Sequence, residues 1–129
     1  MTHLADVNVL IALAWPQHPH HARAVRWFSG LAKNEALATS PLTELGFVRV
    51  SMQLPGLNVG LAVAQAALAQ IRTARRHVFM ADDLPAARMP AWVRTAAHTT
   101  DGHLGELAAA HGAMLVTFDR GIPGAAQIP

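Results

Sequence analysis

Short apolar runs that stop at an acidic residue alternate with segments of helical periodicity, and this alternation restricts the fold most. The run "AMLVTF" (113–118) has the composition of a fully buried strand and ends at Asp119. A shorter strand is predicted over 2–5 and stops at Asp6, and two more are predicted over 35–40 and 77–80. Strands that alternate with helices predict an α/β fold of three α/β/α layers with a central, mainly parallel sheet.

The helices between these strands are predicted from their start and stop signals. Ser40 and Pro41 suit the N-cap and the first position of a helix that continues to about Met52. Thr100 can cap a later helix, and Gly112 suits its end. The predicted helices cover 7–15, Pro19 to about Asn34, 41–52, 60–76 and 101–111.

The composition indicates one globular domain over residues 1–129. Hydrophobic residues make up 52% of the chain and charged residues only 14%, so disorder is not expected. The sequence contains no cysteine, which excludes disulfides and thiol catalysis and fits a reducing compartment. No apolar run reaches the ~18 residues of a membrane span. We therefore expect a cytoplasmic protein that does not enter a membrane.

The basic residues favour a partner that carries phosphate or carboxylate groups. The formal net charge is +2, and Lys33 is the only lysine among ten basic residues. Arginine contacts phosphate and carboxylate groups in bidentate geometry. Nucleic acid and an acidic protein are both compatible with this composition.

Four of the eight acidic residues fall where a parallel sheet would gather them. Asp6 and Asp119 directly follow predicted strands, Glu44 follows a strand by four residues, and Asp101 opens a predicted helix. Parallel strands end at the same edge, so these side chains are expected to share one cleft. Clustered carboxylates repel each other unless a cation neutralises them, and oxygen ligands suit Mg²⁺ or Mn²⁺. Such a site, with a basic rim, is typical of a nuclease.

Three sequence blocks carry a resemblance to a known family. They are "ADVNVLIAL" (5–13), "TSPLTELGFVR" (39–49) and "TTDGHLGELAAAHGAMLVTFDRG" (99–121). In order and spacing they resemble the signature blocks of PIN-domain ribonucleases, and most of all those of the VapC toxins of bacterial toxin–antitoxin pairs. The resemblance runs from near residue 3 to near residue 122, although residues 53–98 match only in general pattern.

The resemblance implies a PIN-like domain that cuts RNA, often structured RNA such as tRNA, and leaves a 5′-phosphate and a 3′-hydroxyl. It implies that Mg²⁺, or Mn²⁺ in its place, activates water and is held by Asp6, Glu44, Asp101 and Asp119. Asn8 and Thr117 match polar positions beside the metal. A cognate antitoxin and a homodimer are the expected protein partners.

Other interpretations of the four acids stay open. Asp6 could cap the following helix, and Asp119 could begin a turn with Gly121. Glu44 and Asp101 could be first-turn acids favoured by the helix dipole. At the level of function, the alternatives are a structure-specific DNA nuclease and a PIN module that binds RNA or a partner without turnover.

A phosphotransferase of the haloacid-dehalogenase type fits poorly. That class needs a second aspartate two residues after the first, where this chain has Asn8. It also needs a lysine downstream, and Lys33 is the only lysine.

Several further side chains have two interpretations each. Arg120, beside Asp119, is a candidate for contact with RNA phosphate. Arg72, Arg75 and Arg76 suit either phosphate binding or a solvated helix end. His103 is expected on a helix surface, with RNA contact or proton transfer as the alternative.

The remaining candidates have structural interpretations. His111 is expected in the core. The "HPHH" segment (18–21) lacks nearby acids or cysteines that would complete a metal shell, and Asp82 and Asp83 are expected to be loop acids. Trp15, Trp27 and Phe28 are expected to pack in the core or an interface.

Overall fold

The computed structural model describes residues 1–74 and 76–129. Within them, five parallel strands form one sheet in the order β3-β2-β1-β4-β5. The strands are β1 (Thr2–Ala5), β2 (Ala36–Thr39), β3 (His77–Phe79), β4 (Met114–Thr117) and β5 (Ala126–Gln127). The predicted α/β class is confirmed, and the sheet is parallel throughout rather than mainly parallel. The short edge strand β5 was not predicted.

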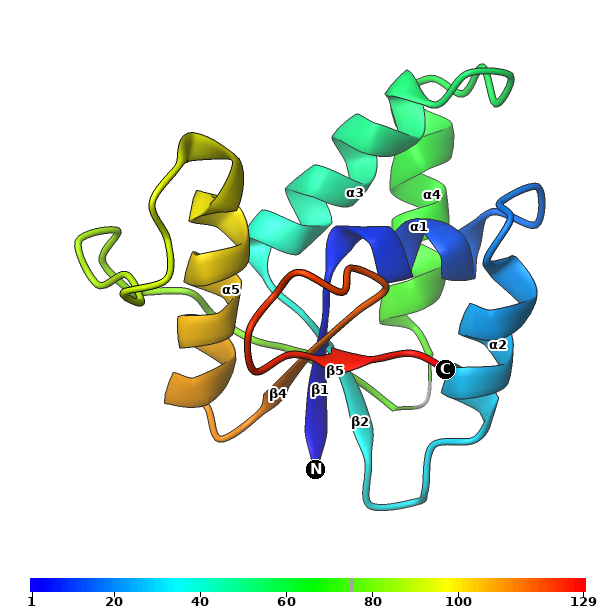
Figure 1. Ribbon diagram of the computed structural model, residues 1–129. Coiled ribbons are helices and arrows are strands. Elements are labelled where there is room, and N and C mark those ends of the chain that lie inside the picture. The colour runs from blue at the N-terminus through cyan, green and yellow to red at the C-terminus, as the bar shows by residue number, and fades with distance from the viewer. Residues whose placement is uncertain (75) are drawn as a thin grey trace.

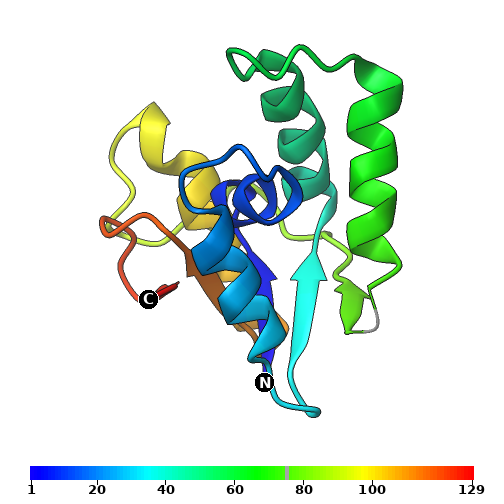
Figure 2. The ribbon, with the colours of Figure 1, turned by 90° about the vertical axis from the view of Figure 1, so that its right-hand side faces the viewer.

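Helices cover both faces of this sheet. They are α1 (Val7–Ala14), α2 (His21–Ser29), α3 (Pro41–Gln53), α4 (Leu61–Arg72) and α5 (Thr99–Ala110), with a 3₁₀ turn η1 (Ala96–His98) before α5. Figure 1 shows α5 on one side of the sheet and α2 and α4 on the other, and α3 rises beyond the edge where the strands end. The view turned by 90° shows the same layers, with α3 and α4 side by side (Figure 2).

The alternation of side chains along the strands produces two cores. Successive residues of a strand point to opposite faces. In β1, Ala5 joins a core with Leu37 and Phe47 on the side of α1, whereas Leu4 joins Leu104 on the side of α5. The expected packing of the large aromatic side chains is confirmed, because Trp15, Trp27 and Phe28 lie against the first core.

Several helix ends differ from the predictions. The helix predicted from Pro19 to about Asn34 is α2, which begins at His21 and ends at Ser29, with Gly30 at its C-cap. The helix predicted over 60–76 ends at Arg72, and α5 begins at Thr99 with His98, not Thr100, at its N-cap. His111 was predicted in the core and is exposed. It occupies the C-cap of α5, where its backbone N–H bonds to carbonyls of the last turn, so its side chain has left the apolar face. Arg75 lies outside the described residues.

The start of α3 follows its sequence signals. Ser40 and Thr43 form a reciprocal capping box, and Pro41 takes the first helical position. This cap fixes the direction in which α3 leaves β2, and hence the position of Glu44 one residue after Thr43. Among the helices that the structure describes, none combines the length and apolarity needed to cross a bilayer.

Gly102 allows the loop before η1 to pack tightly against α5. A Cβ at this position would lie 2.3 Å from Val93 Cγ2 and 3.0 Å from Met89 Sδ, whereas a Cβ at Gly105 would meet nothing within 4 Å. We expect Gly102→Ala to lower the free energy of unfolding by about 1–3 kcal/mol through overpacking. Gly105→Ala, in the same helix, should be neutral or stabilising by up to ~1 kcal/mol. Urea unfolding measures both, and equal stability of the two variants would contradict this packing.

Candidate active site at the carboxyl edge of the sheet

Asp6 lies at the junction of β1 and α1 and is buried, with 8% of its surface exposed. One carboxylate oxygen, Oδ1, accepts a hydrogen bond of 2.7 Å from the backbone N–H of Val7. The other, Oδ2, accepts a bond of 2.8 Å from the hydroxyl of Thr117 at the end of β4. Asp6 therefore caps α1, which was the alternative interpretation of this residue. The same carboxylate is also held at the carboxyl edge of the sheet.

The hydroxyl of Thr117 has all its hydrogen-bonding capacity in use. It donates to Asp6 and accepts from the Asn8 side-chain amide at 3.1 Å and from the backbone N–H of Asp119 at 3.0 Å. The Asn8 carbonyl in turn accepts from the backbone N–H of Phe118 at 3.2 Å. One donor and two acceptor positions are the full capacity of a hydroxyl. Thr117 and Asn8 therefore fix where Asp6 and Asp119 lie relative to each other.

Asp6, Asp101 and Asp119 are close enough to act on one another electrostatically. Burial raises the pKa of the Asp6 carboxyl, and the charge of Asp119 adds to the rise, although the bonds from Thr117 and Val7 oppose it. Burial also raises the pKa of Asp101, and the charges of Asp6 and Asp119 raise it further. Three of the four predicted acids thus share one electrostatic site, although they come from β1, α5 and the end of β4.

Glu44 has different partners. Its Oε2 accepts hydrogen bonds from the hydroxyl of Thr39 at 2.7 Å and from the guanidinium of Arg72 at 2.5 Å. The imidazole of His77 also contacts the Thr39 hydroxyl, at 2.7 Å. Burial and the nearby charge of Arg72 lower the pKa of His77. Glu44 therefore lies at the same edge of the sheet with its charge balanced by an arginine.

The donor set fits a hard divalent cation. Of the three aspartates, Asp6 is buried, Asp101 is half-buried and Asp119 is exposed. Neighbouring carboxylates that repel each other are stabilised by a cation, and ligands that are all oxygen suit Mg²⁺ or Mn²⁺ better than Zn²⁺. As the side chains stand, no three His, Asp or Glu residues in the described part of the chain are arranged to enclose a metal ion. Enclosing one would require some of these side chains to change rotamer.

Other predicted candidates have identified surroundings. His103 was expected on the helix surface, but only 14% of its side chain is exposed, and its Nε2 lies 2.6 Å from the carboxylate of Asp82. Asp82 is thus a partner for α5 rather than a solvated loop acid. Arg120 is exposed directly after Asp119. In the "HPHH" segment, His21 contacts the carbonyl of Ala12 at 2.8 Å.

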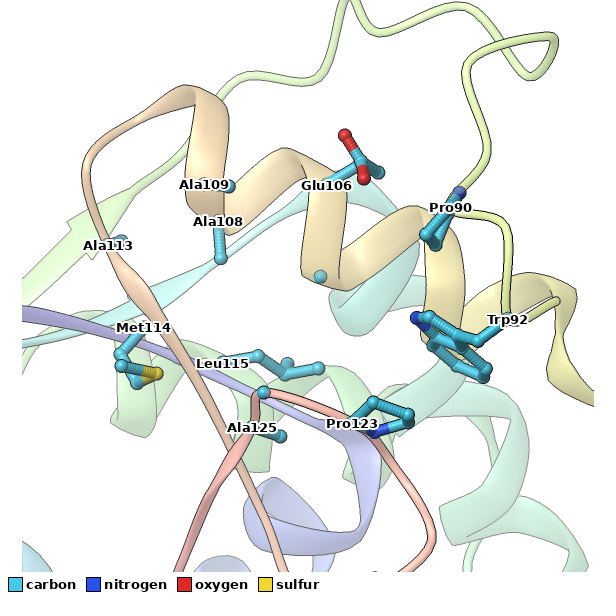
Figure 3. A pocket seen from close by; sticks show the side chains of 12 residues that line it. Pro90, Trp92, Glu106, Ala108, Ala109, Ala113, Met114, Leu115, Pro123 and Ala125 are labelled. Atoms are coloured by element: carbon cyan, nitrogen blue, oxygen red, sulfur yellow. The ribbon is translucent and has the colours of Figure 1, made fainter.

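A hollow of about 300 Å³ lies on the α5 side of the sheet, apart from the aspartates. Figure 3 shows Trp92 and Pro90 on one side of it and Met114, Leu115 and Pro123 on the other. Among the described residues that line it, Glu106 is the only ionisable one. Its wall is otherwise apolar, so this hollow does not supply the chemistry of a nuclease.

The comparisons with known proteins agree with the geometry. The model of the PIN domain matches residues 4–127. Ribonuclease VapC39 of Mycobacterium tuberculosis is 45% identical over 133 residues, which cover 98% of this chain and 95% of that protein. This chain belongs to the VapC toxin family of PIN-domain proteins. The resemblance in the three sequence blocks is thereby confirmed.

Two solved structures share the fold of this VapC-family chain. VapBC2 from Rickettsia felis, bound to a DNA fragment from its promoter, has a TM-score of 0.68 at 16% identity and covers 98% of this chain and 97% of its own. VapC20 of Mycobacterium tuberculosis, a toxin described as cleaving the sarcin–ricin loop, has a TM-score of 0.64 at 14% identity over 90% and 87%. At such identities the likeness concerns the fold alone.

Sequence reasoning missed Thr39, His77 and the pairing of Arg72 with Glu44. Thr39 lies inside one of the three blocks, directly before the predicted N-cap Ser40. It was therefore interpreted only as part of the strand, and the hydrogen bonds of its side chain were not predicted. His77 begins β3, and Phe79, two residues later, is the residue that pairs with Thr39. The contact between His77 and Thr39 therefore depends on the register between β2 and β3. No local spacing in the sequence indicates that register.

The raised pKa of Asp101 predicts how stability depends on pH. The ionised carboxylate is less favourable in the folded protein than in the unfolded chain, so stability should fall as pH rises from the ordinary pKa of 3.8 through the raised value. In buffer with EDTA, we expect Asp101→Asn to have a higher urea midpoint than the parent at pH 7, and the difference to vanish below about pH 4. Asp83→Asn, in an exposed loop position, is the matched control. A midpoint for Asp101→Asn at or below that of the parent at pH 7 would contradict an ionised Asp101 that is destabilised by burial and by its charged neighbours.

Proposed function

We propose that this protein is a Mg²⁺-dependent endoribonuclease, with Mn²⁺ able to substitute, and the toxin of a toxin–antitoxin pair. The observation that carries the proposal is the group of Asp6, Asp101 and Asp119, in which burial raises the pKa of Asp6 and Asp101 and the charges of neighbouring aspartates raise it further. The curated relative that covers 98% of this chain is named a ribonuclease, which supports RNA as the substrate. Which RNA is cleaved stays a prediction, and tRNA is one candidate.

The residues that would hold the cation are Asp6, Asp101 and Asp119, joined by Glu44 once its carboxylate turns from Arg72. When bound, such an ion lowers the pKa of a water nucleophile and offsets charge on the phosphodiester that is attacked. Thr117 and Asn8 serve as positioning residues, because their hydrogen bonds fix Asp6 and the backbone of Asp119. Exposed Arg120 is the nearest candidate for contact with an RNA phosphate. The products would be a 5′-phosphate and a 3′-hydroxyl.

The structural neighbours support a protein partner as well. One neighbour is a VapBC complex, in which the toxin is solved together with its antitoxin. By this analogy we propose a cognate antitoxin for the present chain. A homodimer and a cytoplasmic location stay predictions.

The decisive test is cleavage of total RNA by the purified protein, free of any partner, with Mg²⁺, with Mn²⁺ and with EDTA. We expect discrete fragments that depend on the cation. Asp6→Asn should remove cleavage, with a loss of at least 100-fold, because it keeps the shape of the side chain while removing its charge. End mapping should find 5′-phosphates.

Controls separate chemistry from folding and RNA from DNA. Asp83→Asn changes an exposed loop acid in the same way and should cleave like the parent. Circular dichroism should show that Asp6→Asn is folded. A folded Asp6→Asn protein that still cleaves would contradict the proposed site. Cleavage of structured DNA in preference to RNA would favour a DNA nuclease, and RNA binding without cleavage would favour a non-catalytic module.

A further inference from the structure

The guanidinium of Arg72, at the C-terminal end of α4, contacts two side chains at the carboxyl edge of the sheet. It donates to Glu44, and its Cζ lies 4.9 Å from the centre of the Phe79 ring. Both members of the arginine–phenylalanine pair are accessible, with 42% of the Arg72 side chain and 43% of Phe79 exposed. An accessible cation beside an accessible aromatic ring provides the two contacts that single-stranded RNA uses, phosphate pairing and base stacking.

The position of this pair relative to the aspartates follows from the register of the sheet. Leu4 pairs with Ala38, and Thr39 pairs with Phe79, so Ala5, Thr39 and Phe79 form one row across three neighbouring strands. Adjacent strands lie about 4.8 Å apart, which puts the backbone of Phe79 about 10 Å from that of Ala5, the residue before Asp6. One RNA strand can therefore contact the aspartates and Phe79 together.

Arg72 can leave Glu44 for an RNA phosphate at little cost in free energy. The arginine is the exposed member of this pair, with 42% of its side chain exposed against 15% for Glu44, so water competes for the guanidinium and the pair contributes little to stability. Glu44 would keep its hydrogen bond from the Thr39 hydroxyl after Arg72 left. A phosphate offers Arg72 two oxygens in bidentate geometry, so the guanidinium would lose little in moving from the carboxylate to RNA.

We propose that Arg72 and Phe79 form a nucleotide-binding subsite, in which Phe79 stacks an RNA base and Arg72 leaves Glu44 for a backbone phosphate. The inference rests on the proposed ribonuclease function and adds the residues that place the substrate beside the acids. It has a second consequence, because Arg72 and a divalent cation compete for the same Glu44 carboxylate. Arg72 therefore weakens cation binding when RNA is absent and binds RNA when Glu44 turns to the cation.

The first test measures RNA binding without cleavage. In an Asp6→Asn background, a short fluorescein-labelled single-stranded RNA of mixed sequence is titrated in Mg²⁺ and followed by fluorescence anisotropy. We expect Arg72→Gln and Phe79→Ala each to weaken binding about tenfold. Phe79→Leu, which keeps apolar bulk without a ring, should also weaken it. Arg88→Gln is the matched control, since Arg88 is an exposed arginine that pairs with Glu106 on α5 instead.

The second test measures Mn²⁺ affinity by calorimetry in proteins that carry Asp6, without RNA. Arg72→Gln should bind Mn²⁺ about 3- to 10-fold more tightly, because removing the guanidinium leaves Glu44 free for the cation. Phe79→Ala should bind Mn²⁺ like the parent. A purely structural role for Arg72 predicts the opposite sign, since a loosened site would bind both the cation and the RNA less well.

Failure of the subsite and failure of the proposed function are distinguishable. If the parent cleaves RNA and both Arg72→Gln and Phe79→Ala bind RNA like their background, the subsite is wrong and the ribonuclease stands. Unchanged or weaker Mn²⁺ binding by folded Arg72→Gln would likewise overturn the competition for Glu44. A parent that neither cleaves nor binds RNA would overturn both proposals together.

Discussion

The hydrogen bond from the Thr117 hydroxyl to the Asp6 carboxylate joins the ends of β1 and β4, and the candidate site depends on it. The same hydroxyl accepts from the backbone of Asp119 and from Asn8, so one side chain positions two acids on different strands. Burial at this junction is what raises the pKa of Asp6. Such an arrangement keeps carboxylates together against their repulsion, and a cation that binds there relieves that repulsion.

The same edge of the sheet divides into two electrostatic halves. Asp6, Asp101 and Asp119 form an acidic half over β1 and β4, whereas Arg72 with Glu44 and His77 form a more balanced half over β2 and β3. A nuclease needs both, because the acids hold the cation and basic groups hold the phosphates. Asp6 and Asp119 follow β1 and β4, whereas Glu44, which follows β2, is paired with Arg72.

The sequence predicted where Asp6, Asp119 and Glu44 lie because their places follow from local patterns. A strand that stops at an acid predicts Asp6 and Asp119 wherever the strands pair in parallel, and the cap at Ser40 predicts the place of Glu44. What it could not predict depends on register and long-range pairing. The β5 strand has two residues, and only its pairing with Val116 and Thr117 defines it. The contacts of Arg72 with Glu44 and of His103 with Asp82 join residues that no periodicity connects.

Anomalous diffraction from crystals soaked in MnCl₂ would show directly whether these carboxylates form a site for a divalent cation. We expect one or two strong peaks within about 2.1 Å of carboxylate oxygens of Asp6, Asp101 or Asp119. We also expect Glu44 to turn toward the ion, directly or through water, and away from Arg72. Manganese peaks confined to other parts of the protein, or no ordered manganese between the aspartates, would contradict such a site.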